Sequence, residues 1–268
     1  MTFELLNIDP VVLLLPLGIA VAGFVAIWPF SVWRRDASLV DVAWGPGFLG
    51  QMCVVAYLLP DVGTRGILLL LLVGIWSLRL GWVIIRRRIR EGHEDPRYAS
   101  MRKSWGNWFW LKSLFVVFAL QAVIQWLLVL APIHGMLAED QQIGVLSAMG
   151  ICISLSGLML ETVADRQLDD FKQRNHDQRK LLKTGLRAYV RHPNYTGEII
   201  FWIGVACIVL EGGALIALLS PVLITLLLTK VSGVPLLDER LGDTRSDFSE
   251  YRKRVPAFFP RVSKRHRS

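Results

Sequence analysis

Four polar side chains lie together immediately before an apolar run, in the stretch RHPNYTGE (191–198): His192, Asn194, Tyr195 and Glu198. Pro193 has no backbone donor and disfavours helix for the residue before it, so we expect the chain to turn at His192 and a helix to begin near Asn194. The first amides of a helix have no acceptor within the helix, and together with these side chains they suit a polar ligand. The alternative is a capped helix start with an interfacial Tyr and a hydrogen-bonded His.

A second polar group follows another apolar run, in LETVADRQLDDFKQ (160–173). Its members recur at helical spacing and therefore share one face if the helix continues through this stretch: Glu161, Asp165, Leu168 and Lys172. Glu161 directly follows LSGLML, which places it at or below the lipid headgroups, where an ionisable residue indicates function. A solvated helix end with ordinary charge pairs is the alternative.

Several cations follow this helix within a short stretch of chain: Lys172, Arg174, Arg179, Lys180 and Lys183. Together they could hold a phosphate-rich ligand, because Arg binds phosphate bidentately and Lys binds it as a point charge. Basic residues are also expected at cytosolic loops for reasons of membrane topology alone. The cluster therefore leaves both interpretations open.

The elements that must position these groups are transmembrane helices. The chain has 268 residues, of which 53% are hydrophobic, and its mean hydropathy is +0.44. Only 19% of its residues are charged, whereas a soluble domain carries about 25%. We therefore expect an all-α, multi-pass integral-membrane protein that forms a single domain over 1–268. Basic cytosolic loops account for the net charge of +8 better than nucleic-acid binding does, so we expect no nucleic-acid partner.

Seven segments fit a membrane span, which needs about 20 apolar residues: 10–33, 38–60, 65–86, 108–131, 142–164, 195–211 and 213–234. Lys and Arg follow alternate segments, and the 132–141 loop has neither residue. Because basic loops stay in the cytosol, we expect the N-terminus outside and the C-terminus in the cytosol. The polar segments 86–103, 165–195 and 238–268 are then all cytosolic and lie at one membrane face.

The three cysteines, Cys53, Cys152 and Cys207, all lie inside apolar runs without metal-ligand spacing. We expect neither a disulfide framework nor a metal site.

The stretch YVRHPNYTGE resembles a signature shared by two groups of membrane enzymes. One group comprises the steroid 5-alpha-reductases and sterol reductases, and the other comprises the isoprenylcysteine carboxyl and phospholipid methyltransferases. The pattern is similar to that of the bacterial steroid 5-alpha-reductase-like proteins of the DUF1295 group. The matching pieces occur in order over 36–262 and include SLVDVAWGPGF, EDPRYASMR and KVSGVPLLDER. The resemblance implies a bacterial inner-membrane location with the active site at the cytosolic face.

The reductases bind NADPH between the cytosolic ends of their last spans, so the resemblance implies the same cofactor here. The implied cofactor-binding residues are Asp165, Leu168, Lys172, Arg179, Lys180, His192, Asn194, Tyr195, Glu198, Glu239 and Tyr251.

The steroid 5-alpha-reductases polarise the substrate enone with a carboxylate on the second span and a Tyr on the third. Phe48 and Trp76 fall near those positions, and neither can act as an acid. The remaining candidates for catalysis are Asp41, Arg79 and Tyr98. The candidate substrate contacts are Trp44, Phe48 and Trp76.

The resemblance implies an NADPH-dependent oxidoreductase acting on CH–CH groups. Its substrate would be a lipophilic small molecule, steroid-like or isoprenoid, that enters from the bilayer among the membrane lipids. The alternative is a membrane methyltransferase that uses S-adenosylmethionine, which carries no phosphate and a positive sulfonium. A small transporter or scaffold is a third possibility, although it would not need polar groups gathered at one face. The sequence leaves the oligomeric state open.

Overall fold

The computed structural model describes residues 10–138, 142–175, 177 and 180–260, and these residues form helices and no strand. The α-helices are α1 (Pro10–Arg34), α2 (Leu39–Val42), α3 (Trp44–Leu58), α4 (Gly63–Glu91), α5 (Pro96–Trp105), α6 (Phe109–Ser113), α7 (Leu120–Leu137), α8 (Val145–Arg174), α9 (Pro193–Leu210), α10 (Leu219–Leu226), α11 (Val234–Thr244) and α12 (Phe248–Arg254). Short 3-10 or π-helical turns link several of them. The predicted all-α membrane fold is confirmed.

Six helical segments in the described residues are long and apolar enough to cross a membrane. The segment predicted at 38–60 is also helical, but it is divided into α2 and the 15-residue α3. At about 1.5 Å per residue, α3 spans roughly 22 Å, which is shorter than the hydrocarbon core of a bilayer. The count of seven spans and the orientation of the chain stay predictions.

Two boundaries predicted from local sequence are confirmed. α9 begins at Pro193, whose fixed φ and missing N–H suit the first position of a helix. α8 continues without a break through the polar stretch after Glu161 and ends at Arg174. Asn194, Tyr195 and Glu198 therefore project from α9 and the second polar group from α8, whereas His192 directly precedes α9.

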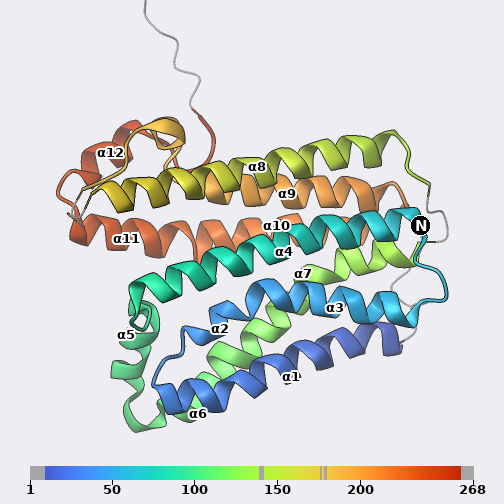
Figure 1. Ribbon diagram of the computed structural model, residues 1–268, viewed down its shortest axis with the longest axis horizontal. Coiled ribbons are helices and arrows are strands. Elements are labelled where there is room, and N and C mark those ends of the chain that lie inside the picture. Colours follow the sequence, from blue (N-terminus) through green and yellow to red (C-terminus); the bar gives the residue numbers. More distant parts are fainter. Residues whose placement is uncertain (1–9, 139–141, 176, 178–179, 261–268) are drawn as a thin grey trace, which may run out of the picture. The chain divides into compact units, whose positions relative to one another are not determined.

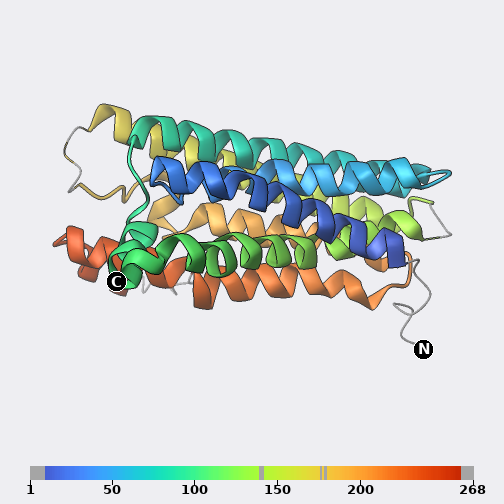
Figure 2. The same ribbon diagram turned by 90° about the horizontal axis from the view of Figure 1, so that it is seen from below.

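The chain divides into two compact units, one formed by 1–148 and 206–220 and the other by 149–205 and 221–268. A single domain over 1–268 stays a prediction. In the first unit, α1, α3, α4 and α7 pack against one another (Figures 1 and 2). Gly45 on α3 allows the closest approach, because a Cβ there would lie 2.6 Å from the backbone nitrogen of Gly81 on α4.

In the second unit, glycines bring α8 and α9 into backbone contact. A Cβ on Gly157 would lie 2.5 Å from the backbone nitrogen of Phe201, and one on Gly197 would lie 2.7 Å from Cγ of Glu161. Small residues at helix contacts are the usual means of close packing within membranes. The contact places the buried Glu161 against the first turns of α9.

Glu211, which follows α9, caps the start of α8 within the first unit. Its carboxylate accepts from the backbone N–H groups of Gly144 (2.9 Å), Leu146 (3.0 Å) and Ser147 (3.1 Å). The hydrogen bonds from Ser147 and the other two amides lower the pKa of Glu211 below its ordinary value of 4.5, against an opposing contribution from desolvation. These amides have no acceptor within α8, so the carboxylate satisfies them.

We predict that Glu211→Gln lowers the melting temperature by about 2 °C at neutral pH, the scale of losing a helix cap. Because the pKa is lowered in the folded protein, the carboxylate contributes its full stability above the ordinary value and loses it as the pH falls through the lowered one. Thermal unfolding in detergent between pH 3 and pH 7 measures this. The difference between wild type and variant should disappear at the acid end, and a difference independent of pH would contradict the cap.

Candidate functional site

In the first unit, the loop after α1 is bound to the loop before α5. The backbone N–H of Ala37 donates to Glu94 (2.8 Å), and that of Asp95 donates to the hydroxyl of Ser38 (2.7 Å). Arg102 binds the same Glu94 carboxylate through two nitrogens, at 2.7 and 3.1 Å. Hydrogen bonds therefore hold the stretches SLVDVAWGPGF and EDPRYASMR against each other, although they are far apart in sequence.

Asp41 and Tyr98 meet where these two stretches are joined. The Tyr98 hydroxyl donates to Oδ1 of Asp41 (2.8 Å), and Arg97 donates to Oδ2 (3.0 Å). Asp95 caps α5 by accepting from the backbone N–H of Arg97, and Pro96 occupies the first turn. The cap thus fixes the start of α5, from which the side chains of Arg97 and Tyr98 reach Asp41.

The hydrogen bonds continue from Tyr98 into the helices. Gln121 on α7 donates to the Tyr98 hydroxyl (3.1 Å) and accepts from the indole N–H of Trp44. Gln125, one turn further, donates to the carbonyl of Trp44 (2.7 Å). Gly47 makes room for this side chain, because a Cβ there would lie 2.8 Å from its Cδ. The phenol therefore has both a donor and an acceptor partner, which fixes its orientation.

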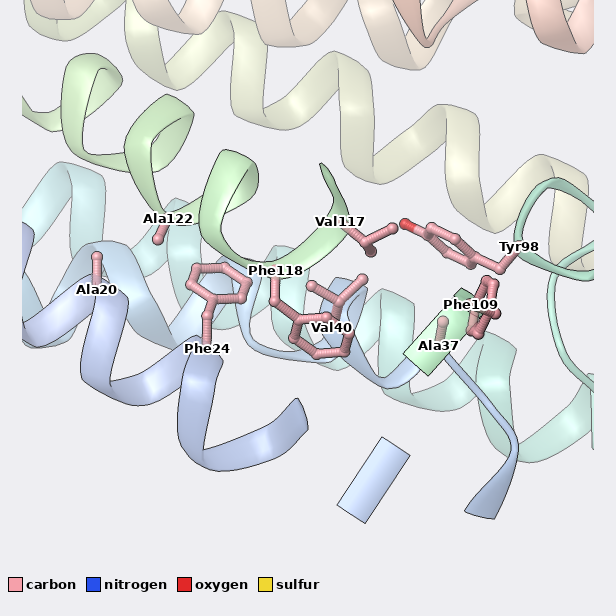
Figure 3. Packing of buried hydrophobic residues seen from close by; sticks show 9 residues of the cluster. All are labelled: Ala20, Phe24, Ala37, Val40, Tyr98, Phe109, Val117, Phe118 and Ala122. Carbon is pink, nitrogen blue, oxygen red and sulfur yellow. The ribbon is translucent and has the colours of Figure 1, made fainter. Parts of the chain in front are cut away.

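The surroundings of Tyr98 are apolar. The residue is 4% exposed and belongs to a buried cluster that also includes Ala37, Val40, Phe109 and Val117. Figure 3 shows Tyr98 at one end of this cluster, with Phe109 and Ala37 beside its ring. A hydrogen bond in such surroundings is stronger electrostatically than in water.

The structure brings two of the three predicted catalytic residues together, Asp41 and Tyr98. Arg79 lies on α4 two positions from both Ser77 and Gly81, which face Gly45 of α3. Two positions correspond to about 200° around a helix, so Arg79 points away from the α3 contact.

The three predicted substrate contacts form one aromatic group. Phe48 packs against Trp44 with ring centroids 5.7 Å apart and against Trp76 at 5.1 Å. Phe48 is 0% exposed and Trp76 is 1% exposed, so these two residues act as core in this structure. Trp44 is half-buried and donates to Gln121, so it is the member of the group that touches the hydrogen-bonded series leading to Tyr98.

In the second unit, the start of α9 is covered by the tail that follows α12. The backbone N–H groups of Arg191 and His192 donate to the carbonyls of Pro256 (2.8 Å) and Ala257 (3.0 Å). The hydroxyl of Thr196 donates to the carbonyl of Phe258 (2.9 Å). The stretch RHPNYTGE is therefore bound to the tail.

Asp238 on α11 is buried beside the start of α9 and binds two residues there. Its carboxylate accepts from Arg191 (2.7 Å) and from Nε2 of His192 (2.9 Å), and all three side chains are buried. Burial lowers the pKa of His192 below its ordinary value of 6.5, against the opposing effect of Asp238. His192 is therefore neutral at pH 7, with its proton on Nε2, and Nδ1 is left as an acceptor.

Arg187 and Tyr251 complete the covered region. The Tyr251 hydroxyl donates to the carbonyl of Arg187 (2.5 Å), and the Arg187 guanidinium donates to the carbonyl of Arg191 (2.7 Å). Burial lowers the pKa of Arg187, while Tyr251, Asp165 and Tyr195 lie near enough to oppose the shift electrostatically. The predicted residues Asp165, Tyr195 and Tyr251 are thus gathered around Arg187.

Within this short region, several buried polar atoms have no hydrogen-bond partner among the described residues: Nε of Arg187, Nε of Arg191, Nδ1 of His192 and Oδ1 of Asn194. Buried polar groups are almost always satisfied in native proteins, so a cluster of exceptions requires an explanation. Two donors and two acceptors in one region fit a polar ligand or ordered water.

Two open grooves border the same region of the second unit. One, of about 670 Å³, lies along α11 and α12 and is lined by residues that include Glu239, Arg245, Arg252 and Lys253. The other, of about 420 Å³, is lined by Gln167, Phe171 and Arg174 of α8 and by Thr184 and Gly185. Gln167, Phe171 and Arg174, which line this groove, lie on a different face of α8 from Asp165 and Leu168.

The remaining predicted cofactor residues differ in exposure. Leu168, Asn194 and Glu198 are partly buried, whereas Lys172, Lys180 and Glu239 are exposed. Arg179 lies outside the described residues.

The resemblance places both Asp238 and Glu239 in the region that covers the cofactor, but only Glu239 was assigned to cofactor binding, and Asp238 is the buried one, 4% exposed. A signal was present, because Asp238 shares the face of α11 that carries Val234, Leu237 and Leu241. Arg187 and Arg191 were also missed as binding groups, since cations at this position fit the topology rule equally well.

The model of the DUF1295 family, described as a protein of unknown function, matches residues 27–255. The chain belongs to the DUF1295 family. It is 25% identical over 201 residues to the uncharacterized protein C594.04c of Schizosaccharomyces pombe. That match covers 66% of this chain and 58% of the yeast protein. No solved structure matches this DUF1295 protein.

We predict that Asp238→Asn loosens the tail of this DUF1295 protein. Without the carboxylate, the buried charge of Arg191 is uncompensated, and removal of one partner of a buried pair costs about 3–5 kcal/mol. Trypsin cleavage at the exposed Arg252–Arg254 stretch should therefore accelerate more than about tenfold in protein that remains monodisperse in detergent. Glu239→Gln, one residue away and exposed, is the matched control, and equal cleavage of the two variants would contradict the role of Asp238.

Proposed function

We propose that this DUF1295 protein is an integral-membrane, NADPH-dependent reductase of an activated double bond in a lipophilic substrate. The hydrogen bond between Tyr98 and Asp41 carries the proposal. Both enzyme groups that share the RHPNY signature need a cofactor, but only reduction needs an acid beside an apolar substrate. Asp41 and Tyr98 supply the carboxylate and the phenol that polarise the enone, a role that Phe48 and Trp76 cannot perform.

The chemistry required of the protein is acid catalysis. Reduction of an enone adds a hydride to the β-carbon and a proton to the α-carbon, and negative charge develops on the carbonyl oxygen between these steps. A phenol can donate a hydrogen bond to that oxygen and lower the barrier. Tyr98 is held by Asp41 and Gln121 and is packed among apolar residues. Its single hydrogen goes to Asp41 in the structure, so the substrate carbonyl would take the place of Asp41 as the acceptor of that hydrogen.

NADPH, when bound, supplies the hydride. The residues at the start of α9 fit a dinucleotide: the free Nε groups of Arg187 and Arg191 suit acceptors, and the free atoms of His192 and Asn194 suit amide or amine donors. We assign cofactor binding to these residues together with Asp165, Leu168, Tyr195, Glu198 and Tyr251. Lys172 and Lys180 are solvent-exposed and suit the outer phosphates.

The alternative is methyl transfer from S-adenosylmethionine, which the shared signature also supports. The two cofactors differ in charge, since only NADPH carries phosphates. A ligand panel therefore separates the two functions directly.

We predict that NADPH raises the melting temperature of the detergent-solubilised protein, whereas S-adenosylmethionine does not. A ligand that binds only the folded state stabilises it by about 2.7 kcal/mol at a hundredfold excess over Kd. Asn194→Ala should abolish the stabilisation. The reverse ligand preference would replace reductase by methyltransferase, and stabilisation by neither ligand would remove both.

The double variant Lys172→Gln/Lys180→Gln should weaken NADPH about tenfold and NADH less, since two exposed contacts contribute roughly 0.7 kcal/mol each. Lys103→Gln, another exposed lysine, is the control.

We predict that Tyr98→Phe reduces kcat about 10²- to 10⁴-fold, the usual contribution of an acid, and leaves stabilisation by NADPH unchanged. Turnover is measured as NADPH oxidation with a panel of enone lipids that contains a 4-en-3-one steroid and an isoprenoid enone. Tyr57→Phe is the matched control, because Tyr57 is 88% exposed. A Tyr98→Phe protein that turns over at the wild-type rate would contradict the proposed acid.

A further inference from the structure

The carboxylate of Asp41 is held from both sides. Its Oδ1 accepts from the Tyr98 hydroxyl at 2.8 Å, and its Oδ2 accepts from the Arg97 guanidinium at 3.0 Å. A protonated carboxyl would have to give up an acceptor position to carry the proton. The geometry therefore matches the ionised form of Asp41, in which both carboxylate oxygens accept hydrogen bonds.

Arg97 is itself fixed in place by Asp95. The guanidinium donates through Nε to Oδ1 of Asp95 (2.9 Å), and the backbone N–H of Arg97 donates to the same oxygen (2.9 Å). Asp95 is tethered in turn to Ser38, on the segment that leads to Asp41. Because a guanidinium is a planar fork, one arm held by Asp95 aims another at Asp41. The guanidinium also lies 5.2 Å from the centroid of the Tyr98 ring.

We propose that Arg97 is a positioning residue that keeps Asp41 a carboxylate, so that Tyr98 and not Asp41 is the proton donor. This inference rests on the proposed reductase function, because it assigns the roles within the acid pair of that reaction. Asp41 then accepts the hydrogen of the phenol in the resting protein, and this hydrogen bond breaks when Tyr98 donates that hydrogen to the carbonyl oxygen of the substrate. Arg97 acts on the reaction only through Asp41.

Four charged or titratable groups act on Asp41. Arg97 and Tyr98 contact it directly, and Asp95 and Arg87 act on it from further away. Burial opposes the carboxylate most strongly, and Asp95 opposes it as well, whereas Arg97, the hydrogen bond from Tyr98 and the more distant Arg87 favour it. Removal of Arg97 would leave Asp41 beside apolar residues and a second carboxylate, with the more distant Arg87 as the remaining cation. Asp41 should then take up a proton at higher pH and compete with Tyr98 as a donor.

The test is the protonation of Asp41 in the full chain, measured in lipid nanodiscs without cofactor. Difference infrared spectra follow the C=O stretch of protonated carboxyl groups during a pH titration, and the band absent from Asp41→Asn identifies Asp41. In Arg97→Gln the midpoint should rise by about one pH unit, which is roughly a tenfold increase in proton affinity for a partly exposed pair. Arg102→Gln is the matched control, because Arg102 lies on the same helix, α5, but binds Glu94 and not Asp41.

A midpoint in Arg97→Gln equal to that of the wild type would overturn the proposal. If that variant does not fold, the double variant Arg97→Gln/Asp95→Asn removes the uncompensated carboxylate as well. Its midpoint should also rise, since Arg97 is the nearer charge, and an unchanged or lower midpoint would overturn the proposal.

The kinetic readout is the pH profile of enone reduction. In Arg97→Gln, the rate should depend on pH at the new Asp41 midpoint, and in Arg102→Gln it should not. A merely structural role for Arg97 would change the rate without moving the profile and would overturn the proposal. If the wild type reduces no enone, the proposed function fails, while the infrared midpoint still decides the role of Arg97.

Discussion

A carboxylate surrounded by apolar residues needs a cation or hydrogen-bond donors, and in this protein those partners come from distant parts of the chain. Asp41 binds Arg97 and Tyr98, the latter 57 positions away, and Asp238 binds Arg191 and His192, 47 and 46 positions away. Leaving the buried Asp238 alone would cost several kcal/mol, and leaving the partly exposed Asp41 alone would cost less. Each unit must therefore bring its own pair of segments together, and the candidate sites form where it does so.

We expect the buried pair of Asp238 and Arg191 to contribute more to specificity than to net stability. Transfer of two charges out of water offsets much of their attraction, so a buried pair adds little free energy compared with apolar residues of similar volume. Its effect is to penalise every arrangement in which one partner is missing. In the second unit, the tail contacts the start of α9, and Asp238 of α11 binds Arg191 and His192 there. A shift of α11 along α9 would leave Arg191 charged and buried without its partner. The close backbone contacts of α8 and α9 impose a similar restriction on sliding.

Features determined by local sequence were predictable from it. The apolar runs indicated the helices, Pro193 indicated the start of α9, and helical spacing indicated the continuation of α8 to Arg174. The gathering of Asp165, Tyr195 and Tyr251 around Arg187 followed from the expected proximity of the cytosolic segments.

Pairings over long sequence distances were not predictable. The sequence offered Asp41, Arg79 and Tyr98 as equivalent acid candidates, and only the packing of α3 on α4 separates Arg79 from the other two. The choice between Asp238 and Glu239 required the buried face of α11, because adjacent acids in a helix point in directions about 100° apart. Arg97 appeared only as a basic residue in a cytosolic loop, although its two carboxylate partners give it a defined orientation.

The contacts of RHPNYTGE divide its residues into two groups with coupled tasks. Arg191 and His192 bind Asp238, and Thr196 binds the tail. Asn194 instead has a buried side-chain oxygen without a hydrogen-bond partner among the described residues. His192 belongs to both groups, since Asp238 holds its Nε2 and thereby leaves Nδ1 as the acceptor. A ligand that donates to Nδ1 therefore needs the tautomer that Asp238 selects, and Asp238 keeps its position only while α11 and the tail are docked. Ligand binding and tail docking should consequently stabilise each other, because each favours the same state of one histidine.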